Sequence, residues 1–303
     1  MEDLIERAQV LIEALPFIQR FRGTTCVIKY GGHAMLADEL KQGFAQDVVL
    51  LHLVGIKPVV VHGGGPQISD LIKRMGLQSS FVRGLRVTDQ ATMELVEMAL
   101  GRINKELVML LGRHGGRAIG LSGQDGNLLL ARKLRMMLHD AQGLASEVDI
   151  GLVGEVVAVN PELLRTLQAA DFIPVISPVG CDGEGQSYNI NADLVAGKLA
   201  SALKADKLML MTDVAGIVDR DGQLISTLEA SRASALIAQG VISEGMIPKV
   251  ECCIEALAAG VGKTHIVDGR LLHVLLHEIF TRAGIGTQVV SSATATPSLV
   301  NAA

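Results

Sequence analysis

The sequence predicts an α/β protein, a three-layer αβα sandwich in which helices cover both faces of a central, mainly parallel, open sheet. Nearly half of the 303 residues are hydrophobic and only 3% are aromatic, so we expect an aliphatic core, as in sheets covered by helices. Short β-branched runs alternate with segments of helical periodicity, which is the pattern of parallel βαβ units. Two of these runs end in glycine-rich turns, VIKYGG at 27–32 and VVVHGGGP at 59–66.

A helical stripe opens the chain at residues 3–20, with apolar side chains at Leu4, Ala8, Leu11, Leu15 and Ile18. Pro16 lies inside this stripe and is expected to kink or split the helix. A helix ahead of the first strand has no reserved place on the sheet. It either packs locally or reaches another subunit.

Strands and helices then follow one another, assigned from β-branched runs and apolar stripes. In chain order they are strand 25–29, helix 38–54, strand 58–62, helix 67–75, helix 89–111, strands 117–121, 128–132 and 150–159, helix 161–170, strand 173–177, helix 192–203, strand 207–212, helices 231–239 and 246–258, strand 265–268, helix 271–280 and strand 287–290. Asn160 and Pro161 are a typical N-cap and first helical residue, and residues 117–159 have room for a hairpin.

The glycine-rich segment 180–185 is expected to be a flexible loop and is the best candidate for a lobe boundary. The predicted organisation is therefore an N-terminal oligomerisation helix at 1–22, an N-terminal lobe at 23–185 and a C-terminal lobe at 186–303.

Composition excludes several classes of protein. A net charge of −5, no Trp and two Tyr argue against a nucleic-acid binder, which needs a basic patch or a stacking platform. The four cysteines form no C-x-x-C pair, which indicates buried thiols of a reducing compartment and no zinc site. The longest apolar stretch, 48–61, is interrupted by charged residues and proline, so we expect no membrane span and a cytoplasmic location.

The two glycine turns point to anion chemistry. Lys29 ends the first strand, at the sheet edge where open α/β folds bind ligands, although taken alone it also fits a solvated lysine. The run Gly63, Gly64 and Gly65 brings bare backbone N–H groups close to an anion, and the helix after it adds its positive dipole end.

Four further segments carry candidate ligand-binding groups. Arg86, in the motif GLRVT, suits the binding of a carboxylate; the alternative is a surface arginine. Asp193, in the motif NINAD, follows polar residues that also fit the simpler role of helix N-caps. The turn at 212–219 follows a strand and suits a nucleotide. Lys249 lies near the expected N-terminus of a helix, where a positive charge is unfavourable unless an anion binds there. The alternative is that Lys249 is a surface lysine.

Three common nucleotide signatures are missing from the sequence. The segment 260–264, GVGKT, lacks the first P-loop glycine because Leu257 stands there, and it lies between a helix and a strand. We therefore interpret it as a helix C-cap and turn. The protein kinase H-R-D and D-F-G motifs and a Rossmann G-x-G-x-x-G fingerprint are also missing.

Six motifs in order resemble the amino acid kinase family, and within it the branch that phosphorylates N-acetyl-L-glutamate for arginine biosynthesis. They are VIKYGG, VHGGGP, GLRVT, NINAD, TDVAG at 212–216 and EGMIPK ending at Lys249, and they span essentially the whole chain. The resemblance implies the carbamate kinase-like fold and ATP-dependent transfer to the γ-carboxylate of that acceptor.

The resemblance also implies residue roles. Lys29 and Lys249 would straddle the transferring phosphoryl group, with Asp193 holding both; Gly64 and Gly65 would bind the γ-carboxylate, and Arg86 and Asn189 the α-carboxylate. ATP, with Mg2+ carried by its phosphates and no protein metal site, would be bound by Gly31, Gly32, Thr212, Asp213, Val214, Gly216, Ile217, Asp219, Gly245 and Met246.

A second resemblance concerns regulation. The N-terminal helix with LPFI at 15–18, together with EIFT at 278–281 and GIGT at 284–287, is similar to the arginine-inhibited subgroup, whose helices are exchanged in a hexamer, a trimer of dimers. Glu278, Gly284 and Gly286 would then contact arginine. Phe17 stands where that subgroup is expected to have tyrosine.

Other functions remain open at this point. A sister kinase acting on another carboxylate, a carbamate or a nucleotide would share the motifs. A non-catalytic sensor of arginine or nucleotide is disfavoured by intact Lys29, Asp193 and Lys249.

Overall fold

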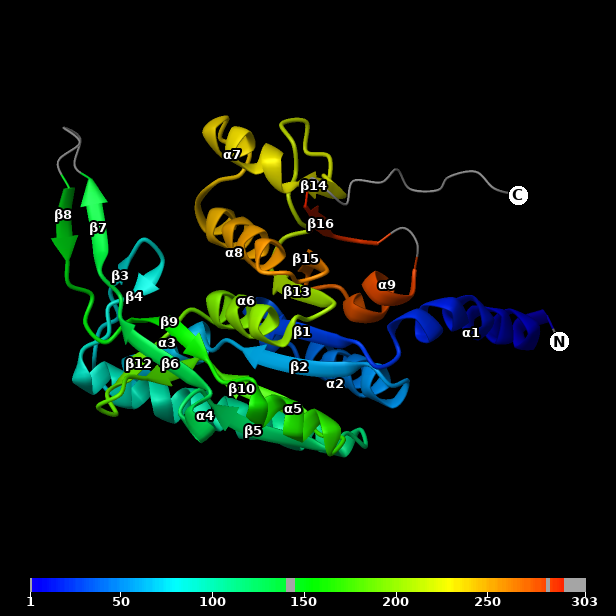
Figure 1. Ribbon diagram of the computed structural model, residues 1–303, viewed down its shortest axis with the longest axis horizontal. Helices are drawn as coiled ribbons and strands as arrows, with labels where there is room; N and C mark the ends of the chain where they lie inside the picture. Colours follow the sequence, from blue (N-terminus) through cyan, green and yellow to red (C-terminus); the bar gives the residue numbers. More distant parts are fainter. Residues whose placement is uncertain (1, 140–144, 282–283, 292–303) are drawn as a thin grey trace.

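A central mixed sheet organises the computed structural model, which describes residues 2–139, 145–281 and 284–291 (Figure 1). Within these residues eight strands pair in the order β14-β16-β15-β13-β1-β2-β10-β5. All neighbouring pairs are parallel except β15 with β16. The predicted open, mainly parallel sheet is confirmed.

Helices cover both faces of this sheet. Successive side chains along a strand point to opposite faces, so each face carries an apolar layer that helices bury. On β1, Thr25–Tyr30, the side chains of Ile28 and Tyr30 join one core and Val27 joins the other. Helices α2 (Asp38–Leu53), α4 (Gln90–Arg113) and α9 (Val274–Phe280) pack in the first layer; α5 (Glu162–Ala169), α6 (Ala192–Leu203) and α8 (Ile247–Ala258) pack in the second. The predicted three-layer sandwich is therefore confirmed.

The remaining strands of the main sheet have bounds close to those expected, except β14, which was not predicted. They are β2 Lys57–His62, β5 Ala118–Ser122, β10 Ile173–Ser177, β13 Lys207–Thr212, β14 Thr227–Glu229, β15 Lys263–Asp268 and β16 Thr287–Val290. Helices α3, Gly65–Arg74, and α7, Ala230–Ala238, and the 3-10 turns η1 Gly32–Met35, η2 Asp125–Asn127 and η3 Glu244–Met246 complete this part.

A second sheet has the order β12-β11-β6-β9. Its strands are β6 Leu129–Lys133, β9 Gly154–Val159, β11 Val179–Cys181 and β12 Ser187–Asn189. The expected hairpin exists as the antiparallel pair of β6 and β9, with the smaller hairpin β7 Met136–His139 and β8 Ala145–Val148 inserted between them. The predicted strand 150–159 begins only at Gly154.

The segment 180–185, predicted as a loop, joins β11 and β12 as a hairpin. The Asp182 carboxylate closes its turn, accepting hydrogen bonds from the N–H groups of Glu184 and Gln186 and from the Tyr188 hydroxyl. Residues 180 and 181 are strand, which corrects the prediction for that end of the segment.

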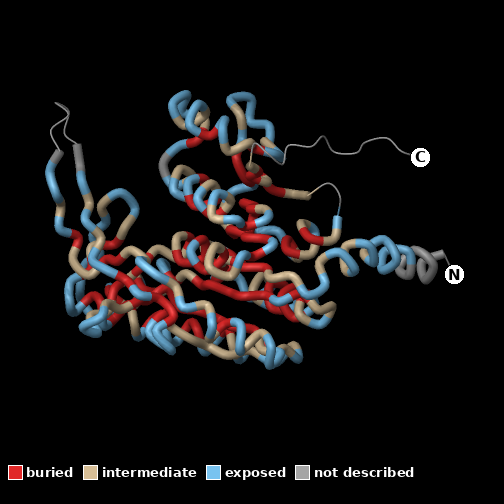
Figure 2. The backbone as a smooth tube through the Cα atoms, in the orientation of Figure 1, coloured by how far each residue is buried: buried red, intermediate tan, exposed pale blue. Residues whose placement is uncertain are grey.

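Helix α1, Glu2–Phe21, extends away from the body of the molecule (Figure 1). It runs without interruption through Pro16, so the expected splitting of this helix is wrong. Its apolar side chains Val10, Leu11 and Ile12 are each at least 60% exposed, and Figure 2 shows most of its described length as exposed. Across the described ranges, the structure has no helix of the length and hydropathy that a bilayer crossing requires.

Candidate functional site

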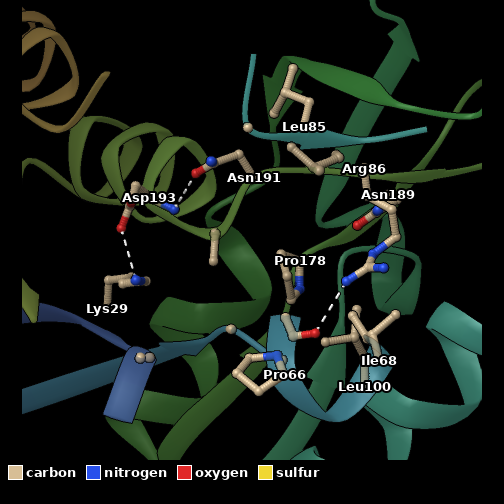
Figure 3. Close-up of a pocket in the computed structure, with 18 of the residues that line it drawn as sticks. Lys29, Pro66, Ile68, Leu85, Arg86, Leu100, Pro178, Asn189, Asn191 and Asp193 are labelled. Atoms are coloured by element: carbon tan, nitrogen blue, oxygen red, sulfur yellow. Dashed lines mark hydrogen bonds and ion pairs between the residues drawn. The ribbon is translucent and has the colours of Figure 1, made fainter. Parts of the chain in front are cut away.

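A cavity of about 540 Å3 lies where β1, β2 and β13 end. These strands are adjacent and parallel, so their carboxyl ends meet at one edge of the sheet. Figure 3 shows side chains from several segments converging on this cavity. Ten of the residues predicted for the site line it: Lys29, Gly31, Gly32, Gly64, Gly65, Arg86, Asn189, Asp193, Asp213 and Lys249.

Two lysines from distant parts of the chain meet one carboxylate. Lys29 Nζ lies 3.2 Å from Asp193 Oδ1, and Lys249 Nζ lies 2.5 Å from Asp193 Oδ2. All three side chains are mostly buried, with 10–16% of their surface exposed. Three charged groups with one net positive charge therefore stand at the cavity, which favours binding of a further anion.

Local sequence explains how Asp193 reaches this position. Asn191 is the N-cap of α6, and its Oδ1 accepts hydrogen bonds from the N–H groups of Asp193 and Leu194. Helix α6 packs on β1, β2 and β13, and on α8, which carries Lys249. The Cys252 thiol donates to the Asp193 carbonyl at 3.1 Å, joining α8 to the first turn of α6.

The protonation state of Asp193 follows from these partners. Burial alone raises the pKa of this carboxyl, but the adjacent Lys29 and Lys249 ammonium groups outweigh burial and hold the pKa below its ordinary value. Asp193 is thus ionised at neutral pH and orients both ammonium groups.

The second glycine turn lines the cavity beside the first, at the ends of the paired strands β1 and β2. Gly64 is the N-cap of α3 and Gly65 its first residue, so their N–H groups belong to the helix end that has no intrahelical acceptors. A Cβ on Gly64 would lie 2.8 Å from terminal methyl groups of both Leu100 and Ile103, so any other residue there would have to displace these side chains. The turn provides a place for an anion at a positive helix end.

Arg86 is held rigidly at the far end of the cavity. It lies on β4, Leu85–Arg86, which pairs with β3, Phe81–Val82, and the Arg86 guanidinium carbon is 4.6 Å from the Phe81 ring centroid. Its Nη1 donates to Ser79 Oγ, and its Nη2 donates to Ser69 Oγ at 2.8 Å and to the Gly65 carbonyl at 3.1 Å. Burial lowers the pKa of Arg86.

Asn189 lies close to Arg86 in Figure 3. Its Nδ2 donates to Thr88 Oγ1 at 3.3 Å, and its backbone N–H donates to the Leu152 carbonyl. An amide and a guanidinium at one end of a cavity suit a carboxylate with a neighbouring polar group.

The first glycine turn brings β1 against the segment after β13. A Cβ on Gly31 would lie 2.8 Å from Lys29 Nζ, so the bare backbone leaves room for this ammonium group. Gly32 has φ +71°, and a Cβ there would lie 2.3 Å from Asp213 Oδ1. Glycine at 32 is required both by conformation and by close approach.

Other residues predicted for the nucleotide do not line this cavity: Thr212, Val214, Gly216, Ile217, Asp219, Gly245 and Met246. Gly245 and Met246 lie in η3, just ahead of the helix that carries Lys249. Ile217 is buried and its N–H donates to Thr287 Oγ1, whereas Asp219 accepts from the N–H groups of Asp221 and Gln223 in its own turn.

The three residues predicted for an effector also come together, away from the cavity-lining residues. Glu278 Oε1 lies 2.7 Å from His265 Nδ1, and its Oε2 accepts from the Ile285 N–H at 3.0 Å. A Cβ on Gly284 would lie 3.2 Å from Glu278 Oε2, and one on Gly286 would lie 2.3 Å from the Ile266 carbonyl.

Electrostatics keep the Glu278 carboxylate ionised. Burial raises the pKa of Glu278, but hydrogen bonds from His265 and Ile285 outweigh it and hold that pKa below its ordinary value. Burial lowers the pKa of His265, so a neutral imidazole donates to an ionised carboxylate.

Sequence reasoning missed the residues that support the site from behind. Ser69 and Ser79 hold Arg86, and no local motif identifies them. His62 precedes the glycine turn and is completely buried among polar groups. A histidine inside a β-branched run was the available signal for it.

Comparisons with known proteins agree on one family. A model described as the amino acid kinase family matches residues 24–268. The acetylglutamate kinase of Geobacter sulfurreducens is 57% identical over 290 residues, covering 95% of this chain and 99% of its own, and that of Geobacter metallireducens is 58% identical over the same shares.

Solved structures agree with this. N-acetylglutamate synthase from Neisseria gonorrhoeae, complexed with coenzyme A and N-acetyl-glutamate, has a TM-score of 0.81 and 28% identity over 93% of this chain; the match spans 63% of the synthase. Carbamate kinase from Giardia lamblia has a TM-score of 0.62 and 18% identity over 89% of this chain and 99% of its own, a likeness of fold alone.

Proposed function

This chain belongs to the amino acid kinase family, and from this premise we propose that it transfers the γ-phosphoryl group of ATP to the γ-carboxylate of N-acetyl-L-glutamate, the second step of arginine biosynthesis. The observation that carries the proposal is the pair of ammonium groups on Asp193 at a cavity that also holds a glycine turn and a buried arginine. Identity of 57% to acetylglutamate kinases over nearly the full chain supports the choice of acceptor.

The reaction joins two anions, which explains this choice of residues. An acceptor carboxylate is already ionised at pH 7, so no general base is required. One carboxylate oxygen attacks the γ-phosphorus, the bond from that phosphorus to the β,γ-bridging oxygen breaks, and ADP leaves with the electron pair. Catalysis then consists of neutralising charge and aligning the reactants.

The residues divide this work. Lys29 and Lys249 stabilise the charge on the migrating phosphoryl group, and Asp193 fixes their positions. Gly64 and Gly65 N–H groups receive the γ-carboxylate. Arg86 and Asn189, at the far end of the cavity, hold the α-carboxylate and its neighbouring acetamido group.

ATP occupies the side of β13. The residues that we assign to it are Gly31, Gly32, Thr212, Asp213, Val214, Gly216, Ile217, Asp219, Gly245 and Met246. Mg2+ prefers phosphate oxygens and water, so we expect it to be carried by the nucleotide, where it neutralises phosphate charge. The cationic wall formed by Lys29 and Lys249 suits such a phosphate-borne ion better than a resident metal.

We base the lobe assignment on the strand order. We assign acceptor binding to residues 23–185 and ATP binding to 186–303, with NINAD completing the acceptor cavity. The flanking strands support this, because β2, β10 and β5 on one side of β1 precede β13, β15 and β16 on the other in sequence. Buried free thiols at Cys26, Cys252 and Cys253 support a cytoplasmic location.

We also propose feedback inhibition by arginine and a hexamer, a trimer of dimers that exchange α1. The anionic Glu278 beside Gly284 and Gly286 suits a guanidinium ligand. In the same region the centroid of the Phe21 ring, on α1, lies 4.9 Å from Lys207 Nζ. The exposed apolar side chains of α1 support its role in assembly.

A hydroxylamine trap tests the function. Purified protein, ATP and Mg2+ are incubated with N-acetyl-L-glutamate, L-glutamate, L-aspartate, carbamate or a nucleoside monophosphate, and acyl phosphate is captured as a hydroxamate. We expect a hydroxamate from N-acetyl-L-glutamate, with ADP formation matching it. Turnover only with another acceptor would identify a sister kinase, and arginine or nucleotide binding without turnover would identify a sensor.

A further inference from the structure

A buried polar network lies directly behind the glycine turn. His62, the last residue of β2, is completely buried, with its Nδ1 2.8 Å from the carbonyl oxygen of Gly63. Its Nε2 lies 3.0 Å from Ser177 Oγ on β10 and 3.3 Å from Asn104 Nδ2 on α4. Nothing in the phosphoryl-transfer mechanism above uses this imidazole.

The tautomer of His62 follows from its partners. A carbonyl oxygen only accepts, so Nδ1 carries the proton and donates to Gly63. Nε2 is then the acceptor, receiving hydrogen bonds from the Ser177 hydroxyl and the Asn104 amide. Burial lowers the pKa of His62 to about 4, which keeps this neutral form throughout the physiological range.

The hydrogen bond to Gly63 has a geometric consequence. The peptide between Gly63 and Gly64 is planar and trans, so its C=O and N–H point in opposite directions. With the carbonyl held on a buried imidazole, the Gly64 N–H points away from the protein interior, on a segment that lines the cavity. A peptide between two glycines turns over easily, because neither residue carries a Cβ.

We infer that His62 is a positioning residue for the acceptor: by holding the Gly63 carbonyl it fixes the Gly64 N–H toward the γ-carboxylate. The inference rests on the proposed function, because it assigns that carboxylate to this N–H. Without the imidazole proton the peptide is free to turn, and its carbonyl would then repel the acceptor. Ser177 and Asn104 contribute indirectly: their hydrogen bonds to Nε2 of His62 keep the imidazole proton on Nδ1.

Two substitutions separate this role from simple packing. In His62→Asn the side-chain amide stands where Nδ1 was and still donates to Gly63. In His62→Gln the amide stands near the Nε2 position, so the contacts to Ser177 and Asn104 survive and the donor to Gly63 is lost. A matched control is His52→Gln on α2, a histidine that pairs with Asp171 and does not line the cavity.

We expect His62→Gln to raise the KM for N-acetyl-L-glutamate about tenfold or more, the usual effect of losing a hydrogen bond to a charged group, with the KM for ATP and the melting temperature nearly unchanged. We expect His62→Asn to stay within about threefold of the parent KM, since it keeps the donor. Equal losses in both variants, or an unchanged acceptor KM in His62→Gln, overturn the inference.

A structural readout keeps the inference separate from the proposed function. The parent protein's hydroxamate assay tests the function, whereas a crystal structure of His62→Gln tests the peptide orientation with or without activity. We expect the Gly63 carbonyl to have turned toward the cavity. A peptide that keeps its parent orientation in that variant contradicts the inference even if the protein is an active kinase.

Discussion

Lys29 and Lys249, 220 positions apart in the sequence, contact opposite oxygens of one carboxylate, that of Asp193. Each ammonium group keeps its remaining N–H donors for another partner. The Asp193 carboxylate thus fixes the distance between the two ammonium groups, and its single negative charge neutralises only one of their two positive charges. This arrangement suits a trigonal phosphoryl group passing between them.

Replacing either lysine tests this relationship. We expect Lys29→Ala and Lys249→Ala each to lower kcat about 100- to 1,000-fold, or about 3–4 kcal/mol, as for loss of a preorganised charge donor. Thermal melting checks that both variants fold. Lys198→Ala serves as the control, because this lysine pairs with Glu255 on the surface and does not line the cavity. An active double variant would refute the mechanism.

Gly31→Ala should disable the site without unfolding the protein. The added Cβ would lie 2.8 Å from Lys29 Nζ, so the ammonium group must move, whereas the φ of Gly31 is not in the left-handed region. We expect kcat to fall at least tenfold, about 1.4 kcal/mol or more, at nearly unchanged stability. In contrast, Gly101→Ala in α4, with open space around its Cβ, should leave kcat unchanged and stabilise the fold by about 0.5–1 kcal/mol. Equal kcat in the two variants would contradict the placement of Lys29.

Arg86→Lys probes the far end of the cavity. A lysine keeps the charge but cannot reach Ser79, Ser69 and a carboxylate together from fixed directions. We expect the KM for N-acetyl-L-glutamate to rise about tenfold or more, with the KM for ATP unaffected. Arg83→Lys, at the exposed tip of the same hairpin, is the matched control. A parallel rise in both Michaelis constants would show that Arg86 acts on the fold instead.

The buried carboxyl of Asp47 leads us to expect that the free energy of unfolding depends on pH. Burial raises the pKa of this carboxyl from 3.8 to about 6, although hydrogen bonding and charge from His273, and charge from His277, oppose the rise. Between those pH values the unfolded chain has released the proton and the folded protein still holds it, so this contribution to stability is complete below pH 3.8 and falls as pH rises to about 6.

Asp47→Asn should therefore gain stability relative to the parent as pH rises from about 4 to above 6, by on the order of 2–3 kcal/mol. Urea unfolding at several pH values measures the difference between the two proteins, which cancels the other titrating groups. A difference that is independent of pH would contradict the raised pKa.

Deleting residues 1–20 tests assembly. Val10, Leu11 and Ile12 are too exposed to contribute to this chain's own core, so the truncated protein should remain folded and lose the exchanged contact. Light scattering coupled to size exclusion should then report dimers in place of hexamers. An unchanged particle mass would exclude helix exchange.

Regular elements with strong apolar patterns were predictable, and irregular ones were not. Helix α6 and strands β10, β13 and β16 have the predicted bounds. The hairpin of β3 and β4 was missed because Arg83 and Gly84 both have positive φ, and arginine gives no signal for that conformation. Strands β7 and β8 pair only with each other and bear no continuous apolar face.

The site was predictable wherever its residues stand in contiguous motifs. Lys29, Asp193 and Lys249 could be proposed from resemblance, but their contact depends on how α6 and α8 pack, which sequence spacing does not specify. Likewise His62 and Ser177 are 115 positions apart, and only the parallel pairing of β2 with β10 brings them together.

Strand β1 lies between β2 and β13, so Ile28 is paired with Val60 on one side and Met209 on the other. Main-chain hydrogen bonds therefore set the spacing of the Lys29 segment from the glycine turn, and side-chain substitutions change it little. Lys249 is placed instead by the packing of α8 on α6. If Arg86 binds the acceptor as we propose, we expect length selectivity to depend on the short hairpin that carries it, at the other end of the cavity. Grafting a shorter or longer hairpin there is consequently the direct route to redesigning the enzyme for diacids of different chain length.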